Sequence, residues 1–76
     1  FRSGQVEQAV QDYTRSIQLD DRQAISFQNR AQALRRLDRR EEALRDFVRA
    51  VALEPRSAEL WTGKAIVLLE LGRQVD

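Results

Sequence analysis

Few side chains in this sequence could serve as a nucleophile or a general base, and those few lack the partners that catalysis requires. The chain contains no His, so its serines lack the base that most often activates a hydroxyl group. A Ser–Lys pair would have to use Lys64, which falls in a regular amphipathic pattern. The absence of Cys also removes thiolate nucleophiles and, with the absence of His, the usual ligands of a structural zinc ion. We therefore expect no catalytic residue, no metal site, no cofactor and no enzymatic activity.

Charged residues gather in short runs, and each run has a structural explanation. Asp20 with Asp21, and Glu41 with Glu42, come at the starts of expected helices, where carboxylates oppose the positive end of the helix dipole. The arginine-rich segment 35–42 could bind an anion or an acidic peptide, because guanidinium groups form paired hydrogen bonds with carboxylates. Glu41 and Glu42, which directly follow the arginines within this segment, favour a solvated turn with locally paired charges instead. The net charge of +1 gives no reason to expect nucleic-acid binding.

The segments that carry these side chains repeat along the chain. When the sequence is shifted by 34 residues against itself, 12 of the 42 aligned pairs are identical, whereas about three would be expected from average composition. Other pairs are chemically similar, such as Tyr13 with Phe47 and Phe27 with Trp61. A repeat of 34 residues explains this agreement.

Apolar residues within each repeat recur at steps of three and four, which is the pattern of an amphipathic helix. One such stripe and its copy consist of Phe27, Ala31, Leu34 and Leu37, and of Trp61, Ala65, Leu68 and Leu71. The expected helices cover about residues 6–19, 24–37, 41–53 and 58–71. No segment shows sustained alternation with a period of two, so we expect no strand.

Turn and capping residues separate these helices. Gly4 precedes the first helix, Asp38 follows the second and tolerates turn geometry, and Gly72 ends the fourth. Pro55 ends the third helix, and Ser57 can cap the fourth.

With this period and these residues, the sequence resembles the tetratricopeptide repeat family, whose unit is a 34-residue helix-turn-helix. The matching positions of the complete copy are Phe27, Ala31, Leu34, Ala43, Phe47, Ala50 and Pro55. The sequence departs from the family pattern at Arg30 and Lys64, where Leu is preferred. The resemblance implies an all-α solenoid segment of about four stacked helices. It divides the chain into the end of one repeat (1–23), one full repeat (24–57) and the start of the next (58–76).

Packing explains why small and large residues occupy these positions. Ala31, Ala43 and Ala50 are small where helices would cross closely. Phe27, Phe47 and Trp61 would supply the large buried surface. We expect these residues to form the scaffold rather than the binding site.

The resemblance also implies a concave groove, lined by the first helices of successive repeats, that takes an extended peptide or a partner helix. The residues expected in this groove are Gln28, Asn29, Gln32, Arg36, Thr62 and Ile66, with Ile25, Arg35, Glu59, Gly63, Leu69 and Glu70 beside them. Helical spacing independently places Gln28, Asn29, Gln32 and Arg36 on one polar face, where amides can pair with a peptide backbone. A solvated face without a ligand is the alternative.

Some members of the family clamp a C-terminal carboxylate. Asn29 stands at one of the clamp positions. Glu59 and Gly63 stand where that clamp requires basic residues, and Glu59 would repel a carboxylate. We therefore do not expect a carboxylate clamp.

The function that these features predict is a protein–protein interaction scaffold that binds a protein or peptide partner, without nucleic acid or membrane. Segment 66–69 of the last helix is apolar on more than one face. A neighbouring helix that lies outside this sequence is the simpler explanation, and self-association through the last helix is the alternative. The repeat region of a larger enzyme is a further alternative. The chain begins at Phe1 and has no Met, so we expect a part of something longer. Its ends, 1–3 and 74–76, resemble the tail of a preceding helix and the beginning of a following one. The lack of signals favours a cytoplasmic location.

Overall fold

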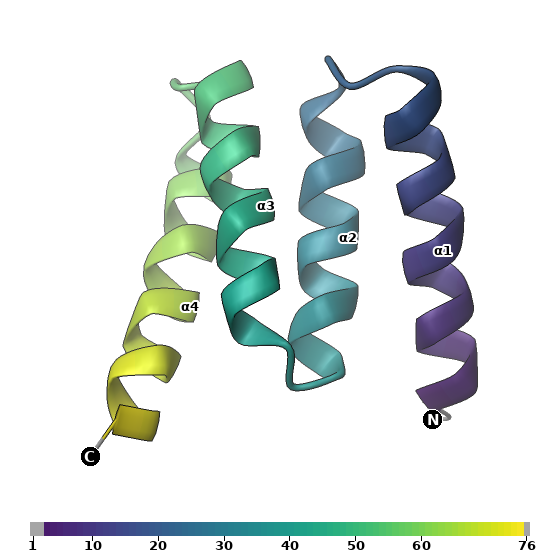
Figure 1. The fold of residues 1–76 in the computed structure, drawn as a ribbon. Coiled ribbons are helices and arrows are strands. Elements are labelled where there is room, and N and C mark those ends of the chain that lie inside the picture. The colour runs from purple at the N-terminus through teal and green to yellow at the C-terminus, as the bar shows by residue number, and fades with distance from the viewer. Residues whose placement is uncertain (1–2, 76) are drawn as a thin grey trace.

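The computed structural model describes residues 3–75 and consists of four α-helices joined by short turns. The helices are α1 (Ser3–Leu19), α2 (Ala24–Arg36), α3 (Arg40–Leu53) and α4 (Ala58–Val75). Each helix runs antiparallel to the next, and all four stand side by side in chain order (Figure 1). The molecule measures 39 × 33 × 16 Å, so the helices form a thin slab. The prediction of an all-α helical-repeat fold is confirmed.

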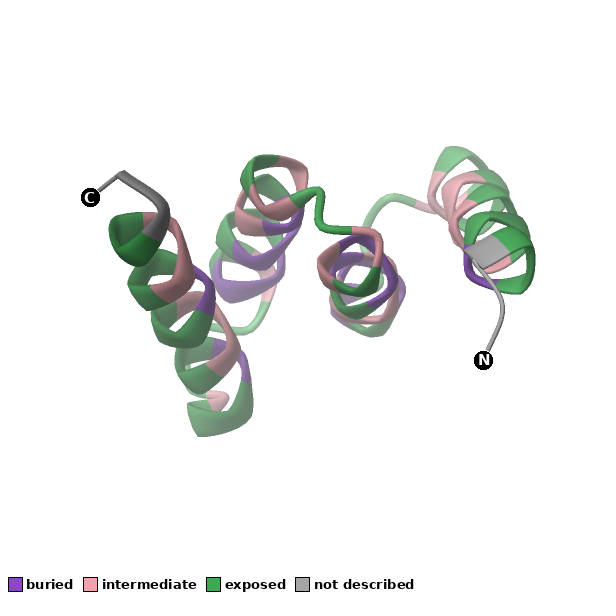
Figure 2. Ribbon diagram, turned by 90° about the horizontal axis from the view of Figure 1, so that it is seen from below, coloured by how far each residue is buried: buried purple, intermediate pink, exposed green. Residues whose placement is uncertain are grey.

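The helices alternate between the two sides of this slab. Viewed along their axes, α1 and α3 lie toward one side and α2 and α4 toward the other (Figure 2). The main packing contacts join each helix to its neighbour in the chain: α1 with α2, α2 with α3, and α3 with α4. The middle helices α2 and α3 are therefore covered on two sides, whereas α1 and α4 are each covered on one.

The buried core follows the repeat pattern. The alanines predicted at helix crossings, Ala31, Ala43 and Ala50, have no exposed surface. The first cluster contains Ala24, Phe27, Ala50, Val51 and Leu60. The second contains Ala31, Leu34, Ala43, Phe47 and Val67. Both clusters join α2, α3 and α4, so these three helices share a continuous core.

Three turn and capping residues that the sequence predicted lie at helix ends. Asp38 adopts φ 64°, a left-handed conformation that Asp tolerates better than most residues. The Ser57 hydroxyl accepts a hydrogen bond from the Leu60 amide at 3.4 Å, which caps α4. The third helix ends at Leu53, two residues before Pro55.

The predicted boundaries at Gly4 and Gly72 are wrong. α1 begins at Ser3 and includes Gly4, and α4 continues through Gly72 to Val75. Neither glycine has a positive φ. Glycine permits a helix to end but does not force it to end, so both residues remain within their helices. Gln74 and Val75 therefore extend α4 rather than beginning another helix, while Phe1, Arg2 and Asp76 lie outside the described residues.

The predicted burial of Trp61 on α4 is also wrong. Trp61 is 47% exposed and Leu68 48% exposed, and Ala65 is exposed as well. The physical reason is that α4 packs mainly against α3, through a different face that includes Leu60 and Val67. Phe27 and Phe47 are buried as expected.

Candidate functional site

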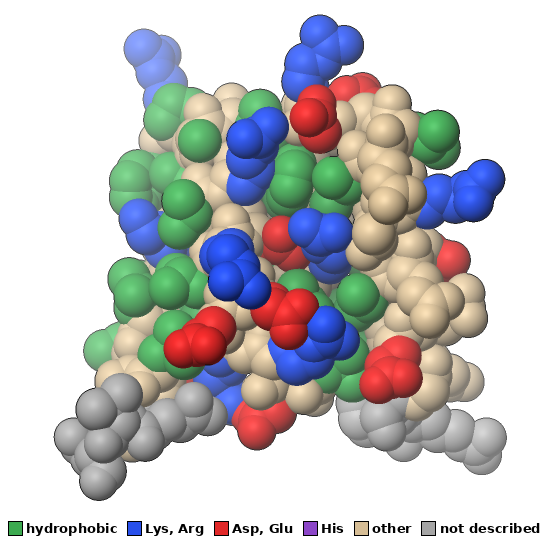
Figure 3. Space-filling model, in the orientation of Figure 1, with side chains coloured by type: hydrophobic (Ala, Val, Ile, Leu, Met, Phe, Trp, Pro, Cys, Tyr) green, Lys and Arg blue, Asp and Glu red, His purple; other side chains and the backbone are tan. Residues whose placement is uncertain are grey.

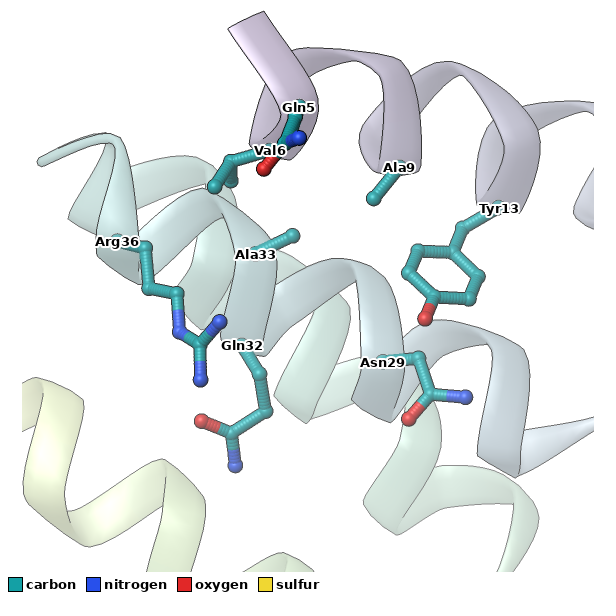
Figure 4. Close-up of a pocket in the computed structure, with 8 residues that line it drawn as sticks. All are labelled: Gln5, Val6, Ala9, Tyr13, Asn29, Gln32, Ala33 and Arg36. Atoms are coloured by element: carbon teal, nitrogen blue, oxygen red, sulfur yellow. The ribbon is translucent and has the colours of Figure 1, made fainter. Parts of the chain in front are cut away.

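A hollow of about 340 Å³ lies between α1 and α2 (Figure 4). Its lining consists of Gln5, Val6, Ala9, Tyr13, Asn29, Gln32, Ala33 and Arg36. The two helices contribute four residues each, so the site depends on how α1 packs against α2. The volume falls at the lower end of the range for ligand-binding clefts.

The hollow combines an apolar base with a polar rim. Val6 and Ala33 are buried and Ala9 is half-buried. The Tyr13 ring points from α1 toward Asn29 on α2, and Gln32 projects from the same side of α2 (Figure 4). This arrangement can receive an apolar side chain, while amide groups at the rim can pair with the backbone that carries it.

Arg36 gives one end of the hollow a positive charge. Its side chain is exposed and forms no salt bridge with any side chain that the structure describes. The neighbouring Arg35 is already bound to Glu70, through Nε at 3.0 Å and Nη2 at 2.7 Å. An incoming carboxylate would thus meet an uncommitted guanidinium group at Arg36.

The structure brings together three of the six residues predicted for the groove. Asn29, Gln32 and Arg36 line the hollow. Gln28 is half-buried on the same helix, and Thr62 and Ile66 are exposed on α4; none of these three belongs to this lining. The side-chain Oε1 of Gln32 also accepts a hydrogen bond from Arg35 Nη1 at 3.4 Å.

Gly63, also expected beside the groove, has a packing role instead. A Cβ atom at this position would lie 2.5 and 2.7 Å from two ring carbons of Phe47, so only glycine lets α4 approach α3 this closely. The shift of 34 residues aligns Gly63 with Asn29, and Phe47 with Tyr13. The interface of α3 with α4 is therefore closed at the position where the interface of α1 with α2 is hollow.

Sequence reasoning missed the contribution of α1 to the hollow. Gln5, Val6, Ala9 and Tyr13 were assigned to packing or left unassigned, because the resemblance directs attention to the first helix of each repeat. A signal was present in the aligned copies: Tyr13 and Asn29 stand where the next copy has the apolar Phe47 and the small Gly63.

The arginine-rich segment 35–42 is largely paired. Arg39 binds Glu42 at 2.7 Å, Arg40 binds Asp38, and Arg40 Nε also reaches Glu70 at 3.2 Å. Basic and acidic side chains lie intermixed on the face seen in Figure 3. The interpretation of locally paired charges holds for Arg39 and Arg40, whereas the link to Glu70 on α4 was not foreseen.

Glu70 receives hydrogen bonds from two arginines on two other helices. Arg35 from α2 and Arg40 from α3 both donate to its carboxylate. The hydrogen bonds and charge of Arg35, and then those of Arg40, lower the pKa of Glu70 to about 2. The carboxylate is thus held ionised and joins three helices.

A second ion pair lies nearer the core and is structural. Arg30, at a position where the family prefers Leu, donates from Nε and Nη2 to the two oxygens of Asp46, both at 2.8 Å. Arg30 Nη1 also donates to the Thr14 hydroxyl at 3.1 Å. The hydrogen bond from Arg30 to Asp46 raises the pKa of Arg30. Asp46 is only 5% exposed, so removing either partner would leave a poorly solvated charge.

Other kinds of site find little support among residues 3–75. No group of three or more acidic side chains in that range is placed to hold a metal ion. None of the four described helices has the length and apolar character needed to cross a membrane.

Comparison with known proteins gives one result. The profile of a family described as tetratricopeptide repeat matches residues 25–67, which is more than half of the chain. The match covers nearly all of α2, all of α3 and the first part of α4. No curated protein and no solved structure matches the chain.

Proposed function

The chain belongs to the tetratricopeptide repeat family, whose repeats generally serve as non-catalytic scaffolds for protein–protein interaction, and we propose that it binds an extended peptide of a protein partner along α2. An apolar side chain of the peptide enters the hollow between α1 and α2. In this proposal residues 24–57 form the full repeat, with 1–23 and 58–76 as the adjoining parts.

The observation that carries the proposal is the composition of the hollow between α1 and α2. Buried Val6 and Ala33 provide an apolar base, while Asn29 and Gln32 provide donors and acceptors at the rim. Since all lining residues lie on helices that are already packed, the receptor loses little conformational freedom on binding. A short apolar side chain fits the volume better than a whole partner helix does.

Arg36 adds a preference for acidic peptides. Its guanidinium group stands at the end of the hollow without a carboxylate partner among the described side chains. A peptide in which an acidic residue lies close to the apolar one would satisfy both features. Thr62 and Ile66 on α4 would extend the contact surface beyond the hollow, because both are exposed.

The test begins with selection from a displayed library of random 12-residue peptides. Selected peptides are expected to share an apolar residue with an acidic residue nearby. Their affinities are then measured by calorimetry for the unmodified chain, for Asn29→Ala with Gln32→Ala, and for Arg36→Glu. We expect the double variant to weaken binding about tenfold, and Arg36→Glu to abolish the preference for acidic peptides.

The matched control is Gln11→Ala with Gln18→Ala, which alters two exposed amides on α1 outside the lining. This variant should bind as the unmodified chain does. Failure to select any peptide, or equal affinity of the selected peptides for both double variants, would contradict the proposal.

A further inference from the structure

Exposed apolar side chains lie on both outer helices of the slab. On α4, Trp61 and Leu68 are 47% and 48% exposed, and on α1 Leu19 is 79% exposed. The internal repeat gives each of these residues a counterpart in the middle of the molecule. The environment of each counterpart indicates what kind of helix would cover the exposed residue.

The stripe on α4 corresponds to a stripe on α2 that is buried. The shift of 34 residues aligns Trp61, Ala65 and Leu68 with Phe27, Ala31 and Leu34. These residues on α2 are 6%, 0% and 3% exposed, because they pack against α3 in the two core clusters. A helix like α3 would therefore cover the stripe on α4.

α1 carries the residues that such a helix needs. The same shift aligns Ala43, Asp46, Phe47 and Leu53 of α3 with Ala9, Asp12, Tyr13 and Leu19 of α1. Leu53 packs against the cluster that contains Phe27, whereas its counterpart Leu19 is largely exposed. Asp46 is 5% exposed, whereas Asp12 is exposed.

The charges on the two faces are complementary. At the interface of α2 and α3, Arg30 and Asp46 form an ion pair at 2.8 Å. The counterparts are Lys64 on α4 and Asp12 on α1, which preserve both signs. Lys64 Nζ lies over the Trp61 ring at 5.1 Å, and Asp12 accepts a hydrogen bond from the Gln8 amide at 3.3 Å.

We propose that α4 of one copy of this chain docks against α1 of a second copy, in the register that α2 and α3 adopt within one chain. Lys64 then pairs with Asp12, and Leu19 covers Trp61. The two faces differ, so the contact is heterologous: each copy keeps a free α1 face or a free α4 face, and assembly continues end to end or closes into a ring. The association is weak, because the contact is one helix face wide.

Self-association is measured with the 76-residue chain by sedimentation equilibrium from about 5 µM to 1 mM. The average mass is expected to rise above the monomer mass of 8.8 kDa with concentration. Fluorescence of Trp61, the single tryptophan, is expected to shift to shorter wavelength over the same range, because docking buries the indole. A chain that stays monomeric at 1 mM would overturn the proposal.

Two end-blocking variants distinguish a heterologous contact from a symmetric one. Leu68→Glu blocks the α4 face and Leu19→Glu blocks the α1 face, and both residues are exposed, so each variant is expected to fold. Each alone should be monomeric, while their equimolar mixture should form a dimer of one copy of each and nothing larger. Self-association of Leu19→Glu alone would indicate an α4–α4 contact and overturn the proposal, as would a mixture that remains monomeric.

The matched control for these variants is Leu69→Glu. Leu69 is 62% exposed on α4 but aligns with Arg35 rather than with the buried stripe of α2. In the assigned register Leu69 takes the place of Arg35, whose carboxylate partner Glu70 aligns with Arg36 of the second copy. Leu69→Glu should therefore assemble at least as strongly as the unmodified chain, and its loss of assembly would contradict the assigned register.

The ion pair is tested by charge reversal. Asp12→Lys and Lys64→Glu should each weaken self-association several-fold, because like charges then meet at the contact. An equimolar mixture of the two variants should recover association, because the reversed α4 face of one variant meets the reversed α1 face of the other and opposite charges pair again. Absence of recovery would remove the proposed register.

Discussion

The interface of α1 with α2 and the interface of α3 with α4 come from the same repeated pattern but differ in their interiors. Between α3 and α4, Phe47 and Val67 are fully buried and Gly63 allows close contact with the Phe47 ring. Between α1 and α2, the aligned residues Tyr13, Ala33 and Asn29 surround a hollow. A few substitutions thus convert a packed helix crossing into a cavity without changing the order of the helices.

The ends of the two interfaces differ in charge as well. Glu70 closes the interface of α3 with α4 by binding Arg40. Its aligned residue in the other interface is Arg36, and Val6 aligns with Arg40. The interface of α3 with α4 therefore satisfies its own charge, whereas the interface of α1 with α2 leaves Arg36 without a carboxylate partner among the described side chains. Under the proposed function, stability and binding are thus assigned to different copies of one repeat.

The greatest loss of stability should come from introducing leucine at Gly63, whereas leucine at the aligned position Asn29 should have a small effect. Gly63→Leu should lower the free energy of unfolding by about 3 kcal/mol, because even a Cβ atom collides with the buried Phe47 ring. Asn29→Leu should lower it by less than about 1 kcal/mol, because its side chain opens onto the hollow. Urea unfolding followed by circular dichroism measures both values. Equal losses would show that the two interfaces are packed alike.

A smaller effect is expected from Ala43→Leu and Ala9→Leu. Ala43 has no exposed surface, so the larger side chain overpacks the helix crossing and should cost about 2 kcal/mol. Ala9 is half-buried and lines the hollow, so leucine there should leave stability nearly unchanged and reduce peptide binding. Thermal unfolding and peptide titration provide the two measurements. An unchanged melting temperature for Ala43→Leu would contradict the described packing.

The weakest effect concerns how the stability contributed by Glu70 at the interface of α3 with α4 depends on pH. The pKa of Glu70 is about 2 in the folded chain and near its ordinary value of 4.5 when unfolded. The unfolded state thus binds a proton more readily, so the stabilisation is present above about pH 5 and is lost as pH falls toward 2. Solvent screens this pair, and we expect a loss of about 1 kcal/mol.

Glu70→Gln is the variant that isolates this contribution. It should be less stable than the unmodified chain at pH 7, and the difference should narrow between about pH 5 and pH 2. A difference that stays constant with pH would mean that the carboxylate charge does not stabilise the interface. Arg36→Gln, at the aligned position of the hollow interface, is the control and should show no such pH dependence.

Much of the fold could be predicted because the repeat is encoded locally. The steps of three and four residues identified four helices, and Asp38, Pro55 and Ser57 marked turns that the structure contains. The positions of Gly4 and Gly72 were misjudged, because a glycine inside a helix costs only about 1 kcal/mol and neighbouring turns can carry the helix past it.

Less of the candidate site could be predicted, because it depends on contacts between distant segments. Asn29, Gln32 and Arg36 were found from their shared helix face, but Tyr13 lies far from Asn29 in the sequence and on another helix. The pairing of Arg30 with Asp46 was missed for the same reason. The prediction that Trp61 is buried was wrong, because the periodic pattern marks an apolar face without showing whether a neighbouring helix covers it.

The position of Glu70 has a consequence for how the molecule unfolds. It lies in the last part of α4 and is bound to both α2 and α3, so α4 cannot separate from α3 without also breaking a link to α2. In a linear array, each element is otherwise coupled only to its immediate neighbours. A coupling between next-nearest neighbours favours the opening of α2, α3 and α4 as one cooperative unit. The hollow between α1 and α2 lies outside this unit on one side, where the hydrogen bond from Arg30 to the Thr14 hydroxyl joins α1 to α2.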